Sequence, residues 1–302
     1  MNIRNSLLAA AALAISVPVH AADLPDSARF EEPATPAGLI FSGIVEGAVG
    51  YSWLTDDTNN EFSDTEYPFL TGGAYVNIPL GMNFSAQLDM NAEGYFSDEG
   101  QDSEAQRSIV SGGAHLNWRD PNIGLLGVFG GVGLGSLTDD DSSQAYWLGI
   151  EGQYYWNNLT LYAQAAFFNG EIPDHSSSVD FEDAYIVRGV ARYFIDPDFR
   201  IEGEASYAAE GNIHGDDYDS LAWGLRADKR ISNHPIYGFV AYRGALHDAD
   251  NPSEGAVTVH DLMVGLKFAF GGNSLLDQDR YGVTLDQPLN GLRATNYITP
   301  LD

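Results

Sequence analysis

The amino-acid sequence predicts an all-β fold: a closed antiparallel transmembrane β-barrel of about 12 strands. Three observations predict it. The chain begins with an export signal, apolar and polar residues alternate with a period of two over most of its length, and the connections between alternating segments are by turns short and long. Ten or fourteen strands are the next possibilities.

The N-terminus has the features of a secretory signal peptide. Arg4 precedes an apolar run at residues 7–17, and a small-residue site ends at Ala21. The run is too short to cross a membrane as a helix. We therefore expect residues 1–21 to be a cleaved signal peptide, and the proline-containing residues 22–38 to be a flexible leader.

Composition narrows the class of protein. The formal net charge is -29, which disfavours nucleic acid as a partner, because phosphate contacts need Lys and Arg. The 16 Tyr, 15 Phe and 5 Trp indicate a folded chain in spite of this acidity. The chain has no cysteine, so an exported fold must be stabilised without disulfides. A sheet that is hydrogen-bonded all the way round meets that need.

Alternation with a period of two defines the strands. From Phe84 to Phe96, for example, every second residue is apolar or small, and most of the residues between them are polar. Such a pattern indicates strands with one apolar and one polar face. We expect twelve of them, at residues 39–54, 67–80, 83–96, 107–118, 124–137, 145–156, 158–169, 183–194, 199–210, 219–231, 236–247 and 257–270.

The connections support a membrane barrel. Short ones, rich in turn formers, lie at residues 81–82, 120–123, 157, 196–198 and 232–235. Longer acidic ones lie between them, at residues 55–66, 97–106, 138–143, 169–182, 210–217 and 248–256. Short periplasmic turns and longer extracellular loops are typical of outer-membrane barrels.

A soluble sandwich or jelly roll is the alternative fold, because it also has many short strands. Its hidden faces would need large apolar residues throughout. Here the polar face of several strands carries repeated charges, and aromatic residues such as Trp53, Phe96 and Trp156 gather near segment ends. Both features favour residues 39–270 as a transmembrane barrel with aromatic girdles.

The last segment, residues 262–270, resembles the closing strand of Gram-negative porins, with Gly265, Phe268 and Phe270 at the matching positions. This resemblance implies a cell outer membrane location and recognition of these three residues by the barrel-assembly machinery. It concerns architecture and matches no specific porin group. Unlike most porins, the chain continues beyond the final Phe, and we expect residues 271–302 to be a C-terminal periplasmic tail or a plug folded into the lumen.

If the apolar faces meet lipid, the polar faces line a lumen. The pore-lining candidates are Glu46, Asp89, Glu93, Glu151, Arg188, Arg192, Arg226, Arg230, Arg243 and Lys267. The acids begin in the first strand, whereas the bases come from the eighth strand onward. In a barrel of twelve, arginines on one wall oppose Asp89 and Glu93 on the other. Two interpretations stay open: a constriction with a transverse field, or ion pairs inside a narrow, largely filled barrel.

The chemistry of the loops is less specific. Acidic pairs in the loops could attract divalent cations, but their spacing matches no calcium loop, so solvated loops are favoured and any metal stays unknown. His214 and His247 lie next to acidic residues, and His115 faces the lumen without a serine partner by spacing. No nucleophile signature accompanies them. We expect no enzymatic activity and no cofactor.

The sequence therefore predicts a porin-like channel for passive diffusion of small hydrophilic solutes. A non-conducting structural or adhesive barrel that acts through its acidic surface loops is the alternative, and a surface hydrolase comes third. The expected partners are outer-membrane lipid, the assembly machinery and small hydrophilic solutes.

Overall fold

The computed structural model describes residues 41–56, 65–96, 108–136, 142–172, 179–213, 216–249, 256–289 and 293. The predicted signal peptide, the leader at residues 22–38 and much of the long connections lie outside these residues.

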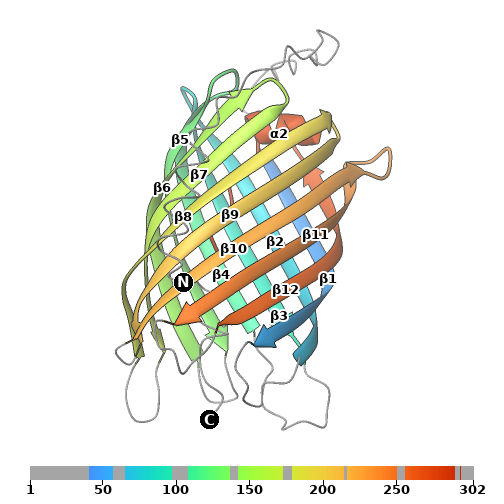
Figure 1. Ribbon diagram of the computed structural model, residues 1–302. Coiled ribbons are helices and arrows are strands. Elements are labelled where there is room, and N and C mark those ends of the chain that lie inside the picture. The colour runs from blue at the N-terminus through green and yellow to red at the C-terminus, as the bar shows by residue number, and fades with distance from the viewer. Residues whose placement is uncertain are drawn as a thin grey trace, which may run out of the picture. The chain divides into compact units, whose positions relative to one another are not determined.

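Within the described residues, the chain forms twelve strands and one short helix (Figure 1). The strands are β1 (Ser42–Asp56), β2 (Thr65–Gly81), β3 (Phe84–Tyr95), β4 (Ser108–Asp120), β5 (Gly124–Ser136), β6 (Ser142–Trp156), β7 (Leu159–Ile172), β8 (Val179–Asp196), β9 (Phe199–Ile213), β10 (Asp216–Arg230), β11 (Ile236–Ala249) and β12 (Val257–Phe270). Each strand pairs with its sequence neighbours, and β1 pairs antiparallel with β12, so the sheet closes on itself. The predicted closed antiparallel barrel of 12 strands is confirmed.

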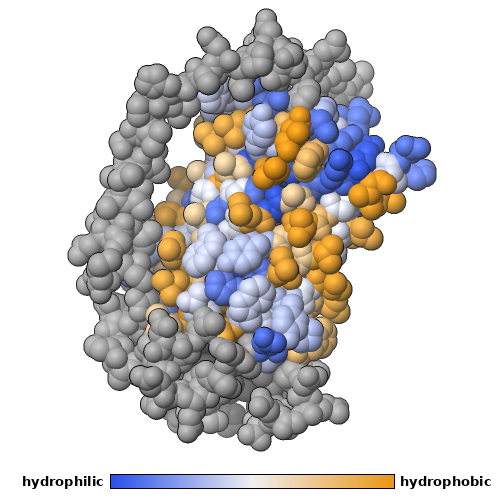
Figure 2. Space-filling view, turned by 45° about the vertical axis from the view of Figure 1, so that its right-hand side comes forward, coloured by the Kyte–Doolittle hydropathy of each residue, from blue (hydrophilic) through white to orange (hydrophobic). Residues whose placement is uncertain are grey.

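The barrel is polar inside and apolar outside. In β3, Gln87 and Asp89 are 0% and 5% exposed, whereas the alternate residues Leu88 and Met90 are 51% and 59% exposed. Many large apolar side chains are exposed on the outer surface, and Figure 2 shows hydrophobic residues (orange) among paler, less hydrophobic ones on one face of the barrel. A soluble sandwich would bury its apolar faces instead, so this arrangement is that of a barrel with lipid around it.

Several strands extend further towards the long connections than the alternation predicts. β8 begins at Val179 rather than near residue 183, and β9 continues to Ile213. The expected long connection at residues 210–217 is therefore wrong, since β10 already begins at Asp216 and pairs with Ile213. Backbone hydrogen bonds continue the ladder where the side-chain pattern has ended.

The closing strand β12 packs tightly against both neighbours at Gly265. A Cβ atom there would lie 2.3 Å from Cζ of Phe239 and 2.5 Å from the carbonyl oxygen of Gly47. Glycine thus leaves room for the Phe239 ring inside the barrel. Phe268 faces outward and is 47% exposed, and Phe270 ends the strand. Recognition of these residues during assembly stays a prediction.

The chain turns after β12 at Gly271, whose φ of 78° favours glycine, and forms helix α2 (Leu275–Tyr281). The Ser274 side chain caps α2 by accepting a hydrogen bond from the backbone of Asp277. The helix lies at the end of the barrel that carries the short turns (Figure 1), where Leu276 donates to the carbonyl of Pro197. No helix in the described ranges is long and apolar enough to cross a bilayer.

Candidate functional site

The inner face of the barrel carries all ten of the predicted pore-lining side chains. Asp89, Glu151 and Arg192 are among those that are buried, and Glu46 and Arg226 are among those that are partly buried. Arg230 lies at the short-turn rim, where it donates to the carbonyl of Asn273. The alternation of each strand positions these side chains, because every second residue faces inward.

A segment from the C-terminal tail occupies part of this interior. Residues 274–289, which we call the lumenal segment, consist of α2 and an extended stretch after it. The Gln87 side chain donates to the carbonyl of Leu285 at 2.6 Å and accepts from the backbone of Thr284 and Leu285 at 3.2 Å. Arg119 donates to the carbonyl of Gly282 at 2.7 Å. Side chains of the inner wall thus satisfy backbone groups of the segment.

Charges on the lumenal segment match charges on the wall. Asp286 pairs with Arg188 at 2.8 Å, and Asp279 pairs with Arg192 at 3.3 Å. Further along the tail, Arg293 pairs with Glu93 at 2.5 Å. These ion pairs between the tail and the wall favour one position of the tail along the wall.

The two aspartates of the lumenal segment that pair with arginines of the wall have pKa values below the ordinary one. Burial raises the pKa of Asp286, but the guanidinium of Arg188 outweighs it, so the pKa lies below the ordinary value of 3.8. Burial likewise raises the pKa of Asp279, and Arg280 and Arg192 together bring it below 3.8. Both carboxylates are therefore charged at neutral pH and retain their ion pairs.

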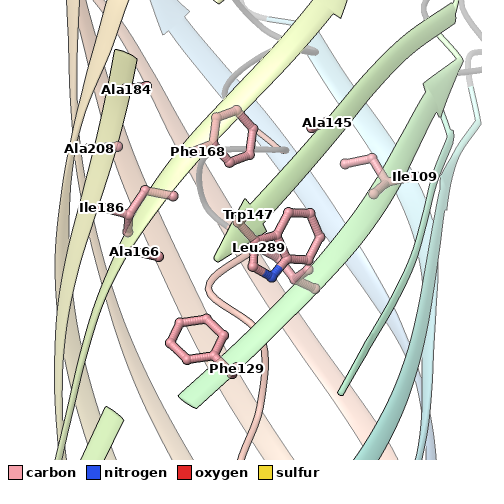
Figure 3. Close-up of a cluster of buried hydrophobic side chains, with 10 residues drawn as sticks. All are labelled: Ile109, Phe129, Ala145, Trp147, Ala166, Phe168, Ala184, Ile186, Ala208 and Leu289. Carbon is pink, nitrogen blue, oxygen red and sulfur yellow. The ribbon is translucent and has the colours of Figure 1, made fainter. Parts of the chain in front are cut away.

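Apolar contacts anchor the segment at two points. Leu285 belongs to a buried cluster with Leu125, Tyr162 and Val190. Leu289 packs beside Trp147 in a larger cluster formed by the inner faces of β4 to β9 (Figure 3). These contacts remove the two leucine side chains from water, which favours the docked position.

Two glycines make room for this docking. A Cβ atom on Gly113 would lie 2.2 Å from Nε2 of Gln287, so only glycine lets Gln287 approach β4 so closely. A Cβ atom on Gly131 would lie 2.6 Å from the Trp147 ring, whose indole nitrogen donates to Gln287 at 2.5 Å. Gly131 of β5 therefore supports the lumenal segment through Trp147.

His115 is held between two carboxylates beneath Gln287. Its Nε2 lies 2.6 Å from Asp89, and its Nδ1 lies 2.8 Å from Glu151. The Tyr162 hydroxyl donates to the same glutamate at 2.7 Å. Because both ring nitrogens face carboxylates in a fully buried site, His115 has no free nitrogen with which to activate a nucleophile.

Most of the described ion pairs inside the barrel belong to two groups, each with equal numbers of carboxylates and cations. The larger group, the ion-pair chain, joins six carboxylates to six cations among the described residues: Glu46, Glu202, Glu204, Asp228, Asp279 and Asp286 with Arg188, Arg192, Arg200, Arg226, Lys267 and Arg280. The smaller group, the Glu93 cluster, joins Glu93 and Asp261 to Arg243 and Arg293. The large negative charge of the chain is therefore not concentrated in these groups.

A cavity of about 150 Å³ remains beside the lumenal segment. The described hydrogen bonds of residues 282–289 to wall side chains go to β3, β4, β6, β7 and β8. The cavity is lined mainly by β1, β2 and β9 to β12, with Glu46, Glu93, Arg226 and Arg243 among its charged residues. The lumenal segment is thus bonded to one side of the lumen, and the cavity lies towards the other side.

The predicted opposition of charged walls is realised in part. Arg243 reaches Glu93 at 2.7 Å, and Arg226 reaches Glu46 at 2.6 Å. Asp89 instead binds His115, which the sequence did not single out as its partner. These side chains are paired with one another, as one of the two interpretations expects, and a cavity remains beside them.

The sequence suggested two further histidines and the acidic loop pairs for other chemistry. His214 and the acidic loop pairs lie outside the described side chains. His247 is buried on the inner face of β11. Sequence reasoning missed Asp279, Asp286 and Arg293, although charges set between leucines in the tail were a signal for a docked segment. No group of metal-binding side chains occurs among the residues that the structure describes.

Comparison with known proteins identifies the fold. No family model and no curated protein matches the chain. An outer-membrane channel from Pseudomonas putida F1 is 12% identical, with 80% of this chain and 98% of that chain covered and a TM-score of 0.54. The translocator domain of the autotransporter NalP from Neisseria meningitidis is 15% identical over 78% and 90% of the two chains, with a TM-score of 0.48. The KdgM porin is 10% identical over 74% and 99%, with a TM-score of 0.43. The chain therefore has the fold of an outer-membrane β-barrel.

Proposed function

We propose that the protein is an outer-membrane channel for small hydrophilic solutes, in which the lumenal segment narrows the passage to one side of the lumen. The observation that carries this proposal is the charged cavity beside the segment. Solutes move along β1, β2 and β9 to β12, whereas the opposite half of the lumen is occupied.

Three features support a channel over a solid barrel. The cavity is lined by charged and polar groups, which suit water and hydrophilic solutes. It lies beside a segment whose own polar groups are already bonded to the far wall, so water can enter without displacing those bonds. The fold is also shared with an outer-membrane channel.

The competing function is a non-conducting structural or adhesive barrel. The dense ion pairs and the lumenal segment are compatible with it, because a filled lumen stiffens the barrel and blocks flow. The two functions differ in one measurable property, the conductance of the folded protein.

Single-channel recording in planar bilayers tests the proposal. We expect small conductance steps from the full mature chain. A chain truncated after Phe270 lacks the lumenal segment but keeps all twelve strands, and its steps should be several-fold larger because the filled half becomes open. Both proteins are first shown to be folded by circular dichroism.

Absence of steps from well-folded full-length protein would remove the channel proposal and favour the structural or adhesive barrel. Equal step sizes from the full-length and truncated chains would show that the lumenal segment does not restrict the passage.

A further inference from the structure

We propose that the cavity binds small zwitterionic solutes, which carry one cationic and one anionic group and no net charge. This inference rests on the proposed channel function, because it names the class of solute that the same cavity accepts. Two independent features carry it: the charged groups of the lining are already paired with one another, and the side-chain amide of Asn91 has no hydrogen-bond partner among the described residues.

The lining charges favour a solute without net charge. Glu46 is paired with Arg226, and Glu93 is paired with Arg243 and Arg293. A simple anion or cation that binds there leaves one charge of a partly buried ion pair without a partner, which is costly. A zwitterion can place its ammonium group on a carboxylate and its carboxylate on an arginine, so every charge keeps a partner.

Asn91 supplies a free hydrogen-bond donor at the same place. Its side chain lines the cavity and is 8% exposed. The Tyr75 hydroxyl donates to Oδ1 of Asn91 at 2.6 Å, whereas Nδ2 has no hydrogen-bond partner among the described residues. A buried donor without an acceptor is unfavourable. A carboxylate oxygen in the cavity would satisfy it.

The size and the apolar part of the lining define the solute further. A cavity of about 150 Å³ is comparable with engineered protein cavities that hold benzene. Ala48, Phe239 and Met263 belong to one apolar cluster and also line the cavity. They can contact a short aliphatic chain between the two charged groups. A small amino acid has these properties.

Isothermal titration calorimetry on the full mature protein in detergent tests the proposal with three probes of matched size. γ-Aminobutyrate is zwitterionic, butyrate is anionic and butylammonium is cationic. We expect saturable binding of γ-aminobutyrate and binding at least about tenfold weaker for the other two. Equal affinity for all three probes, or no binding of γ-aminobutyrate, would overturn the proposal.

Asn91→Leu and Asn117→Leu form a matched pair. Asn117 is also buried and inward-facing, its Oδ1 accepts from Ser85 at 2.9 Å, and its Nδ2 likewise has no partner among the described residues, but it does not line the cavity. We expect Asn91→Leu to weaken γ-aminobutyrate binding about tenfold and Asn117→Leu to leave it unchanged. Asn91→Asp, which keeps the shape and removes the donor, should show the same loss if the leucine variant folds poorly.

Equal binding by both leucine variants and by Asn91→Asp contradicts the role of Asn91 and overturns the site. Conductance of the same preparations separates this proposal from the channel itself. A conducting protein that does not distinguish the three probes loses the zwitterion site and keeps the channel. A non-conducting protein that binds only γ-aminobutyrate keeps the site and loses the channel.

Discussion

At the scale of single residues, the interior depends on positions where a small side chain or a charge admits the lumenal segment. Gly113 permits the approach of Gln287, and Arg188 binds both Glu204 on the wall and Asp286 on the segment. Neither residue acts alone. Each is informative because its partner comes from a part of the chain that is distant in sequence.

Gly113→Val should lower the free energy of unfolding by about 1–3 kcal/mol, because its side chain overlaps Gln287. Gly112→Val is the matched control, since a Cβ atom there meets only the carbonyl oxygen of Asp89 at an ordinary 3.7 Å. Urea unfolding in detergent micelles measures both. If both variants lose the same free energy of unfolding, any larger residue at these positions of β4 is destabilising, and overlap with Gln287 is not the cause.

Arg188 and Asp286 should be energetically coupled. The chain with Arg188→Met and Asp286→Leu together should be more stable than the sum of the single losses implies, by about 0.5–3 kcal/mol, because each single change leaves a buried partner unpaired. A double-mutant cycle of unfolding free energies gives this coupling. If the losses in unfolding free energy of the two single variants simply add, the two side chains do not contact each other in solution.

At the scale of elements, the lumenal segment depends on the barrel wall for its hydrogen bonds, whereas the closed sheet does not depend on the segment. The twelve strands form a complete ladder by backbone hydrogen bonds, and β12 pairs with β1 without help from the tail. The extended part of the segment, in contrast, satisfies much of its backbone through wall side chains such as Gln87 and Arg119. The segment can therefore be released while the barrel stays closed.

Acid should release the segment. Asp279 and Asp286 have pKa values below 3.8 in the folded protein, so their stabilising effect is fully present above the ordinary pKa and is lost as the pH falls through the lowered values. Hydrogen exchange of residues 279–289 should accelerate at pH values below 3.8, relative to the intrinsic rate at each pH, while exchange in the strands stays slow. Unchanged protection of the segment at these pH values would argue against control by the two aspartates.

At the scale of the whole molecule, charge is distributed unevenly. The chain has a net charge of -29, yet the ion-pair chain and the Glu93 cluster are each balanced among the described residues. Ion selectivity of the proposed passage thus depends on small differences between opposed charges, and a single substitution in the cavity lining can change it.

Arg226→Ala should shift selectivity towards cations, because Glu46 and Asp228 lose a shared positive partner beside the cavity. The reversal potential in a potassium chloride gradient measures this shift. Lys229→Ala is the control, since Lys229 is exposed on the outer face and does not line the cavity. An unchanged reversal potential in Arg226→Ala would count against a passage along this wall.

The sequence alone determined the barrel. Period-two alternation is a local property of each strand, so the pattern of residues is enough to assign Gln87 and Asp89 to one face and Leu88 to the other. The strand order followed from short antiparallel connections. The ends of β8, β9 and β10 were harder to predict, because backbone pairing continues where side-chain alternation stops.

Only the tertiary structure decided what fills the lumen. Whether Asp89 meets His115 or an arginine depends on strand register, and a shift of register changes every such neighbour. The path of residues 274–289 depends on contacts with Gln87, Trp147 and Arg188, which lie far away in the chain. The alternation of apolar and polar residues predicts which side chains face inward. It contains no information about which inward side chains meet, because that depends on distances across the closed barrel.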